Sequence, residues 1–158
     1  MATSCKYPYL KRIRLNSVSR PLYENDATKA KEKALGDIVC AKWKCELQKV
    51  SIKYHVDCLA LREGEAMAWV ELRCRNNHVL QYPTLMISLA KVQGAKRLQE
   101  DTGLPVFLVV EWNDSVMFTN LGQCDFTLGF GGRNEIRDWQ DQEPVCHIPI
   151  EQFQEFRQ

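Results

Sequence analysis

The segment VFLVVEW at residues 106–112 is almost wholly apolar and rich in β-branched side chains. A run of this length and composition is typical of a strand that is buried on both faces at the centre of a sheet. Both faces of such a strand must be covered, so the chain needs a layer of structure on each side of the sheet. We therefore expect a layered α/β fold in which this strand is central.

Helices and further strands are expected around this segment. Helices are predicted over residues 24–46 and 84–101, where apolar side chains repeat with a period of about 3.6 residues. Alternation of apolar and polar side chains predicts strands at residues 50–61, 67–75, 115–121 and 126–133. The last stretch, 134–158, is expected to be an acidic loop over most of its length. The order of these elements predicts a mixed sheet flanked by helices.

The length of 158 residues suits one domain, which we place at residues 24–158 behind a basic arm at residues 1–23. Residues 1–100 hold 18 Lys and Arg against 10 Asp and Glu, whereas residues 101–158 hold 3 against 10. A basic front half is compatible with a polyanionic partner such as a nucleic acid.

Cysteine usage and hydropathy predict a compartment. The 7 cysteines are odd in number and include no C-x-x-C pair, which argues against a secreted disulfide framework. No run approaches the ~18 apolar residues needed to cross a bilayer, and the N-terminal segment has no apolar stretch of signal-peptide type. We therefore expect a protein of the reducing cytoplasm with no membrane partner.

Two acids, Asp57 and Glu71, lie on short apolar segments joined by a turn at residues 62–65. If the turn is a three-residue loop, the two acids are directly opposite each other, with Cβ atoms roughly 4.5–5.5 Å apart. A two-residue loop, which is more common, would send one acid to the other face. Arg73 points from the same face as Glu71. Because opposed carboxylates repel unless a cation lies between them, the pattern predicts a divalent-metal site; the alternative is a solvated hairpin with an incidental acid pair.

The series of elements resembles the PD-(D/E)XK, or restriction-endonuclease-like, nuclease superfamily, and the block GGRNEIRDWQDQEPVCHIPI at 131–150 is similar to the tails of its small phage-type members. That family has an acid on one strand, Glu-x-Lys on the next, then a helix and a central apolar strand. The matching segments are HVD ending at Asp57, WVELRCRN with Glu71 and Arg73, YPTLMISLAK at 82–91 and TGLPVFLVVEW at 102–112. The resemblance implies an αβββαβ core and an enzyme that hydrolyses phosphodiester bonds.

The resemblance also implies a set of metal ligands. Asp57 and Glu71 would hold Mg²⁺ or Mn²⁺ through their carboxylates, with the backbone carbonyl of Leu72 as a third oxygen. An acid on the first helix often completes such sites. Glu32 is the candidate by its spacing, with Glu24 behind it.

Arg73 stands where the family pattern has lysine. An arginine cannot lose its proton near neutral pH, but it can hold the scissile phosphate through a bidentate fork. Lys91 on the second predicted helix is the better candidate for a displaced catalytic ammonium, and Lys96 is the other. For both lysines, the alternative is a solvated helix face.

These observations lead to two functional hypotheses. The first is a Mg²⁺-dependent nuclease that acts on duplex or branched DNA as a homodimer, intracellular and phage-encoded in a bacterial host. The second is a catalytically degenerate member of the fold that binds nucleic acid or a protein partner, which the arginine at position 73 favours.

Overall fold

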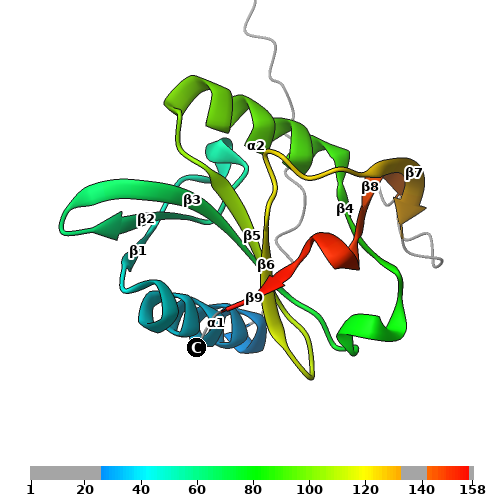
Figure 1. The fold of residues 1–158 in the computed structure, drawn as a ribbon, viewed down its shortest axis with the longest axis horizontal. Coiled ribbons are helices and arrows are strands. Elements are labelled where there is room, and N and C mark those ends of the chain that lie inside the picture. Colours follow the sequence, from blue (N-terminus) through cyan, green and yellow to red (C-terminus); the bar gives the residue numbers. More distant parts are fainter. Residues whose placement is uncertain (1–25, 133–141, 157–158) are drawn as a thin grey trace, which may run out of the picture.

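A computed structural model describes residues 26–132 and 142–156 of the chain (Figure 1). The basic arm predicted at residues 1–23 lies outside these residues. Neither described helix is long and apolar enough to span a membrane.

The main sheet has six strands in the order β1-β2-β3-β5-β6-β9, and β3 and β5 are its parallel pair. The other neighbouring strands in this sheet are antiparallel. Its strands are β1 (Glu46–Lys49), β2 (Cys58–Arg62), β3 (Glu65–Cys74), β5 (Val106–Glu111), β6 (Val116–Asn120) and β9 (Gln154–Glu155).

Helices and a smaller sheet complete the described part of the fold (Figure 1). Helix α1 (Asp26–Trp43) packs against β3, and helix α2 (Leu89–Thr102) packs against β5 and the smaller sheet. The smaller sheet has the order β4-β8-β7 and consists of β4 (Thr84–Ser88), β8 (Gln142–Pro149) and β7 (Thr127–Gly132). Helix α1, then β1, β2 and β3, then α2 and β5 form the expected αβββαβ core.

The central position of VFLVVEW is confirmed. Val109 belongs to the apolar cluster on the α1 side, whereas Leu108 and Val110 belong to the cluster on the α2 side. All three side chains are 0% exposed. Each face of β5 is therefore covered, as the unbroken apolar run requires.

The predicted strand at 50–61 is wrong in its first half. A short 3-10 helix, η1 (Ile52–Tyr54), and a bend precede β2, while the first strand of the meander is β1. His55 lies in this bend and adopts φ 59°, a left-handed conformation that interrupts a strand. Lys44, at φ 50°, ends α1 in the same way, so the predicted helix end at residue 46 is also wrong.

The helix predicted at 84–101 begins at Leu89, five residues after the predicted start, because residues 84–88 form β4. Leu85 pairs with Ile148 and both are buried, so a partner some sixty residues away along the chain decides the local structure. The partner strand, β8, lies in the stretch that was expected to be a loop. Gly103 ends α2, with φ 71° and its N–H donating to the Gln99 carbonyl.

The hairpin between β2 and β3 has a two-residue turn, Glu63-Gly64, in which both residues have positive φ. Of the two loop lengths left open by the sequence, the structure has the shorter one. A β-bulge restores the expected register, because Ala60 pairs with Ala68 while Leu61 pairs with Ala66, which leaves Met67 as the extra residue. Cys58 consequently faces Val70. Asp57 precedes Cys58 in the bend beyond the paired register, where its charge lies close enough to act on Glu71.

Candidate active site

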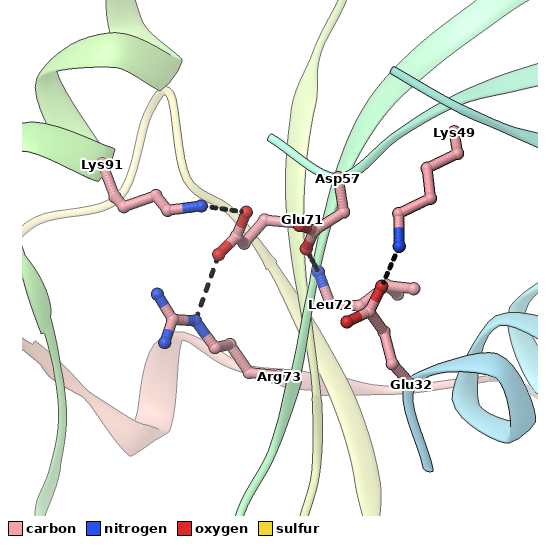
Figure 2. A network of polar contacts seen from close by, with 7 residues as sticks. All are labelled: Glu32, Lys49, Asp57, Glu71, Leu72, Arg73 and Lys91. Atoms are coloured by element: carbon pink, nitrogen blue, oxygen red, sulfur yellow. Dashed lines mark hydrogen bonds and ion pairs between the residues drawn. The ribbon is translucent and has the colours of Figure 1, made fainter. Parts of the chain in front are cut away.

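Glu71 lies in the middle of β3, where its side chain is only 2% exposed. One carboxylate oxygen, Oε2, accepts a hydrogen bond from Lys91 Nζ at 2.8 Å, and the other, Oε1, accepts one from Arg73 Nε at 3.1 Å. Figure 2 shows all three side chains on the same side of β3. Two protein cations therefore contact the Glu71 carboxylate, whereas the sequence predicted that a bound metal ion would offset its negative charge.

Asp57 is held just before β2 begins. Its backbone N–H donates to the Val70 carbonyl at 3.1 Å, and its Oδ2 accepts from the Leu72 N–H at 2.8 Å. The Asp57 carboxylate thus accepts the backbone N–H of Leu72 in β3, at a position where β2 provides no backbone partner. The N–H and C=O of a strand residue point to the same edge, so the Leu72 carbonyl also faces this open edge beside Asp57.

Helix α2 fixes the bend that carries Asp57. Gly94 lies so close to the bend that a Cβ there would be 2.9 Å from the His55 Cβ, which is closer than ordinary packing. Only a glycine permits this approach without a shift of the bend. The contact ties α2, which supplies Lys91, to the segment that supplies Asp57.

Lys91 stands in the first turn of α2. A cation at a helix N-terminus works against the helix dipole, and the ion pair with Glu71 offsets that cost. Its side chain is 28% exposed, so the ammonium is partly open to solvent. Lys96, the other candidate, lies elsewhere, with Nζ 5.1 Å from the centre of the Phe126 ring.

The pKa of Glu71 is raised from 4.5 to about 7, and burial is the largest cause. The neighbouring Asp57 charge also raises it, while Lys91 and Arg73 act in the opposite direction. Desolvation and like-charge repulsion thus outweigh two favourable contacts. A carboxyl group with a pKa shifted this far toward neutrality is a feature of functional sites.

Glu32 does not join this group. It lies on α1, where Oε1 is 3.1 Å from Lys49 Nζ, and Figure 2 shows this pair on the opposite side of β3 from Lys91 and Arg73. The structure therefore brings together Asp57, Glu71, Arg73 and Lys91. Within the described ranges, no group of three or more His, Cys, Asp or Glu side chains could hold a metal ion.

The donor set nevertheless fits a hard cation. Asp57, Glu71 and the Leu72 carbonyl offer oxygen atoms alone, which Mg²⁺ and Mn²⁺ prefer. Magnesium ions are commonly held by one or two carboxylates, with waters and substrate phosphates as the remaining ligands. A metal ion at Glu71 would have to share a carboxylate that Lys91 and Arg73 also contact.

Arg75 was missed by the sequence reasoning. It follows Arg73 by two positions, one residue beyond the end of β3, and its N–H still donates to the Glu111 carbonyl of β5, so its side chain leaves from the same face. Its Nη2 donates to the Met86 carbonyl at 2.7 Å, and burial, with a smaller effect from Arg73, lowers the pKa of its guanidinium. The signal was present in the sequence as the alternation Glu71, Arg73, Arg75.

The chain is similar to a known protein family and to solved structures. The sequence model of a family described as "Phage putative PDDEXK endonuclease" matches residues 18–156. No curated protein matches the chain in sequence. Among solved structures, the chain is similar to Hjc of Archaeoglobus fulgidus, a Holliday junction resolvase, with a TM-score of 0.53 and 14% identity. That similarity covers 79% of this chain and 91% of Hjc, and it establishes the restriction-endonuclease-like fold.

Proposed function

Because the chain belongs to the phage PDDEXK endonuclease family, we propose that it hydrolyses phosphodiester bonds in DNA with the help of a divalent metal ion. The observation that carries the proposal is the meeting of Asp57, Glu71, Arg73 and Lys91 around one buried carboxylate. Two acids and two bases at one point of a sheet suit a reaction in which negative charge develops on phosphate oxygens.

In this proposal Asp57 and Glu71 hold Mg²⁺ or Mn²⁺, with the Leu72 carbonyl as a further oxygen ligand. The ion, when bound, lowers the pKa of a coordinated water and stabilises charge on the phosphoryl oxygens. Asp57 is already oriented for this role by the Leu72 N–H. Glu32 remains a weaker candidate ligand, because it is paired with Lys49.

Arg73 binds the scissile phosphate. Its Nε is used by Glu71, and Figure 2 shows its two terminal nitrogens directed away from that carboxylate. A guanidinium in this position presents a planar pair of donors, which matches two phosphate oxygens. The Glu71 contact fixes the orientation of the fork before substrate arrives.

Lys91 supplies the ammonium that is missing at position 73, where the family pattern has lysine and this chain has Arg73. An ammonium has three donors and can exchange a proton, whereas an arginine keeps its proton in proteins. From the first turn of α2, Lys91 reaches the same carboxylate as Arg73. We assign Lys91 to orienting the attacking water and Arg73 to the phosphate.

The direct test is cleavage of DNA by the purified full chain. We expect nicking of supercoiled plasmid, or cutting of branched DNA, with Mg²⁺ or Mn²⁺ and none with a chelator. Calcium serves as a matched ion control, because it binds oxygen ligands with a looser geometry than Mg²⁺. Absence of cutting with both Mg²⁺ and Mn²⁺, under conditions where DNA is bound, would refute the proposal.

A second candidate function is DNA binding without cleavage. The observation in its favour is that both oxygens of Glu71 contact protein cations, so the protein itself already occupies this carboxylate. A chain that shifts DNA in a gel and cuts none with either metal would support this reading. The homodimer and the bacterial cytoplasm remain predictions from the sequence.

Substitutions at Lys91 and Arg73 separate their roles. We expect Lys91→Gln to lower the cleavage rate by about 10²- to 10⁴-fold, the range for loss of a positioned proton-transfer group. Arg73→Lys is expected to lower it by roughly tenfold, because one ammonium replaces a bidentate fork. Single-turnover rates on one oligonucleotide measure both. A large gain in cleavage by Arg73→Lys would show that the native site is impaired and that Lys91 does not replace the motif lysine.

A further inference from the structure

A row of three side chains, Glu71, Arg73 and Arg75, begins at the candidate site on β3 and continues one residue past the end of the strand. Glu71 and Arg73 leave β3 on the side covered by α2, where their parallel partners Leu108 and Val110 belong to the buried cluster. Arg75 follows with the same alternation, because its N–H still donates to the Glu111 carbonyl of β5. Alternate residues of a strand are roughly 6.6–6.8 Å apart. Successive phosphates of a nucleic-acid strand have a comparable spacing, so the row can follow a strand away from the scissile phosphate.

Arg75, at the end of the row, has an unsatisfied guanidinium. Its Nη2 donates to the Met86 carbonyl, but its Nε is buried and has no hydrogen-bond partner in the described part of the chain. No ion pair of Arg75 with a carboxylate occurs among residues 26–132 and 142–156. A partly buried charge without a counter-ion is costly, and a bound anion would remove that cost.

The same guanidinium lines an open hollow of about 360 Å³ between the end of β3 and β4. Trp112, at 4% exposure, forms part of its lining, and Tyr82, at 57% exposure, and His147 also line it. The lining contains a guanidinium and no carboxylate. A pocket with aromatic and apolar walls and one cation can bind a nucleic-acid base together with its phosphate.

We propose that this hollow binds one unpaired nucleotide of the DNA, adjacent to the phosphate that is cut. Arg75 contacts the phosphate of that nucleotide, and the ring of Tyr82 stacks against its base. The inference rests on the proposed function, because it takes the Glu71 site as the point of cleavage. It narrows the substrate to DNA with a single-stranded nucleotide at that point, such as a flap, an overhang or an open branch.

The test measures binding without cleavage, with the wild-type chain in a chelator. Fluorescence anisotropy compares a blunt duplex with the same duplex carrying a short single-stranded tail. We expect the tailed duplex to bind more tightly by about 5-fold to 100-fold, the range for one base stacked on an aromatic ring. A tail whose first unpaired nucleotide is abasic is expected to lose this gain.

Two variants and two matched controls locate the effect. Tyr82→Ala and Arg75→Gln should each remove the preference for the tail, and Tyr82→Ala should leave affinity for blunt duplex unchanged. Leu80→Ala changes a residue of the same turn, η2 (Val79–Gln81), that is 84% exposed and does not line the hollow. Arg62→Gln removes another guanidinium that makes a 2.7 Å bond to a backbone carbonyl, at the far end of the hairpin. Both controls should keep the preference.

Specific results would overturn the inference. Equal affinity for tailed and blunt duplex, or an unchanged preference in Tyr82→Ala or with the abasic tail, refutes the nucleotide site. Should Arg75→Gln fail to fold, judged by circular dichroism, the exposed Tyr82 still decides the question. A chain that discriminates between the two DNAs but cuts neither with metal would refute the proposed function and leave the nucleotide site standing. A chain that cuts both DNAs and binds them equally would refute the nucleotide site and support the proposed function.

Discussion

Replacing Asp57 with asparagine is expected to lower DNA cleavage by about 10³-fold or more, while the chain still folds. The magnitude follows from the several kcal/mol that a bound metal ion contributes to a phosphoryl transition state. Asparagine keeps an oxygen that can accept the Leu72 N–H, so the bend before β2 keeps its anchor. Removing the Asp57 charge also removes one cause of the raised pKa of Glu71, so stability should be equal or higher.

The measurement is a cleavage time course with Mn²⁺ beside a thermal melt of the same preparation. Asp101→Asn is the matched control, because Asp101 is exposed in the last turn of α2, at the opposite end of the helix from Lys91. It should cut DNA at the wild-type rate. Cleavage that survives in both Asp57→Asn and Glu71→Gln would mean that the site is wrongly assigned.

The second large effect concerns stability and pH in the metal-free protein. The pKa of Glu71 is about 7 in the folded chain against 4.5 ordinarily, so the folded state binds its proton more tightly than the unfolded state. The stabilisation is therefore fully present below about pH 4.5 and is lost as the pH rises through 7. The shift corresponds to a loss of the order of 3 kcal/mol in the free energy of unfolding across that window.

Glu71→Gln removes this titration. Urea unfolding at pH 5 and pH 8 should show the variant gaining stability relative to wild type as the pH rises, by up to about 3 kcal/mol. The control is Glu46→Gln, an exposed position on the edge strand β1, whose difference from wild type should stay nearly constant. Mg²⁺ favours the ionised carboxylate and should reduce the wild-type loss at pH 8. Parallel pH curves for wild type and Glu71→Gln would contradict the raised pKa.

How far the sequence could predict this fold depends on where each element finds its partner. The central strand was predictable because burial on both faces shows in the local composition of residues 106–112. Strand β4 was not, because its pattern suits a helix face as well, and β8 decides between them from residues 142–149. The bend at His55 was hidden as well, since an alternating pattern does not reveal a positive φ.

The same distinction applies to the candidate site. That Arg73 leaves β3 from the same face as Glu71 follows from strand alternation, so it could be predicted, and the contact between the two side chains agrees with it. The contact of Lys91 with Glu71 depends on where α2 begins and how it crosses β3, which local patterns do not contain. Glu32 was chosen by spacing along a helix, and spacing does not tell which side of the sheet that helix covers.

The turn at Glu63-Gly64 and the extra residue at Met67 together separate the tip of the hairpin from its base. A change of one residue at the tip can be absorbed at the bulge, because the bulge already accommodates a mismatch between the two strands. A Cβ placed at Gly64 would meet no atom within 4 Å, so the tip also has free space around it. The hairpin tip is therefore a suitable attachment point for a fluorophore or an inserted peptide tag that must leave the alignment of Asp57 with Glu71 undisturbed.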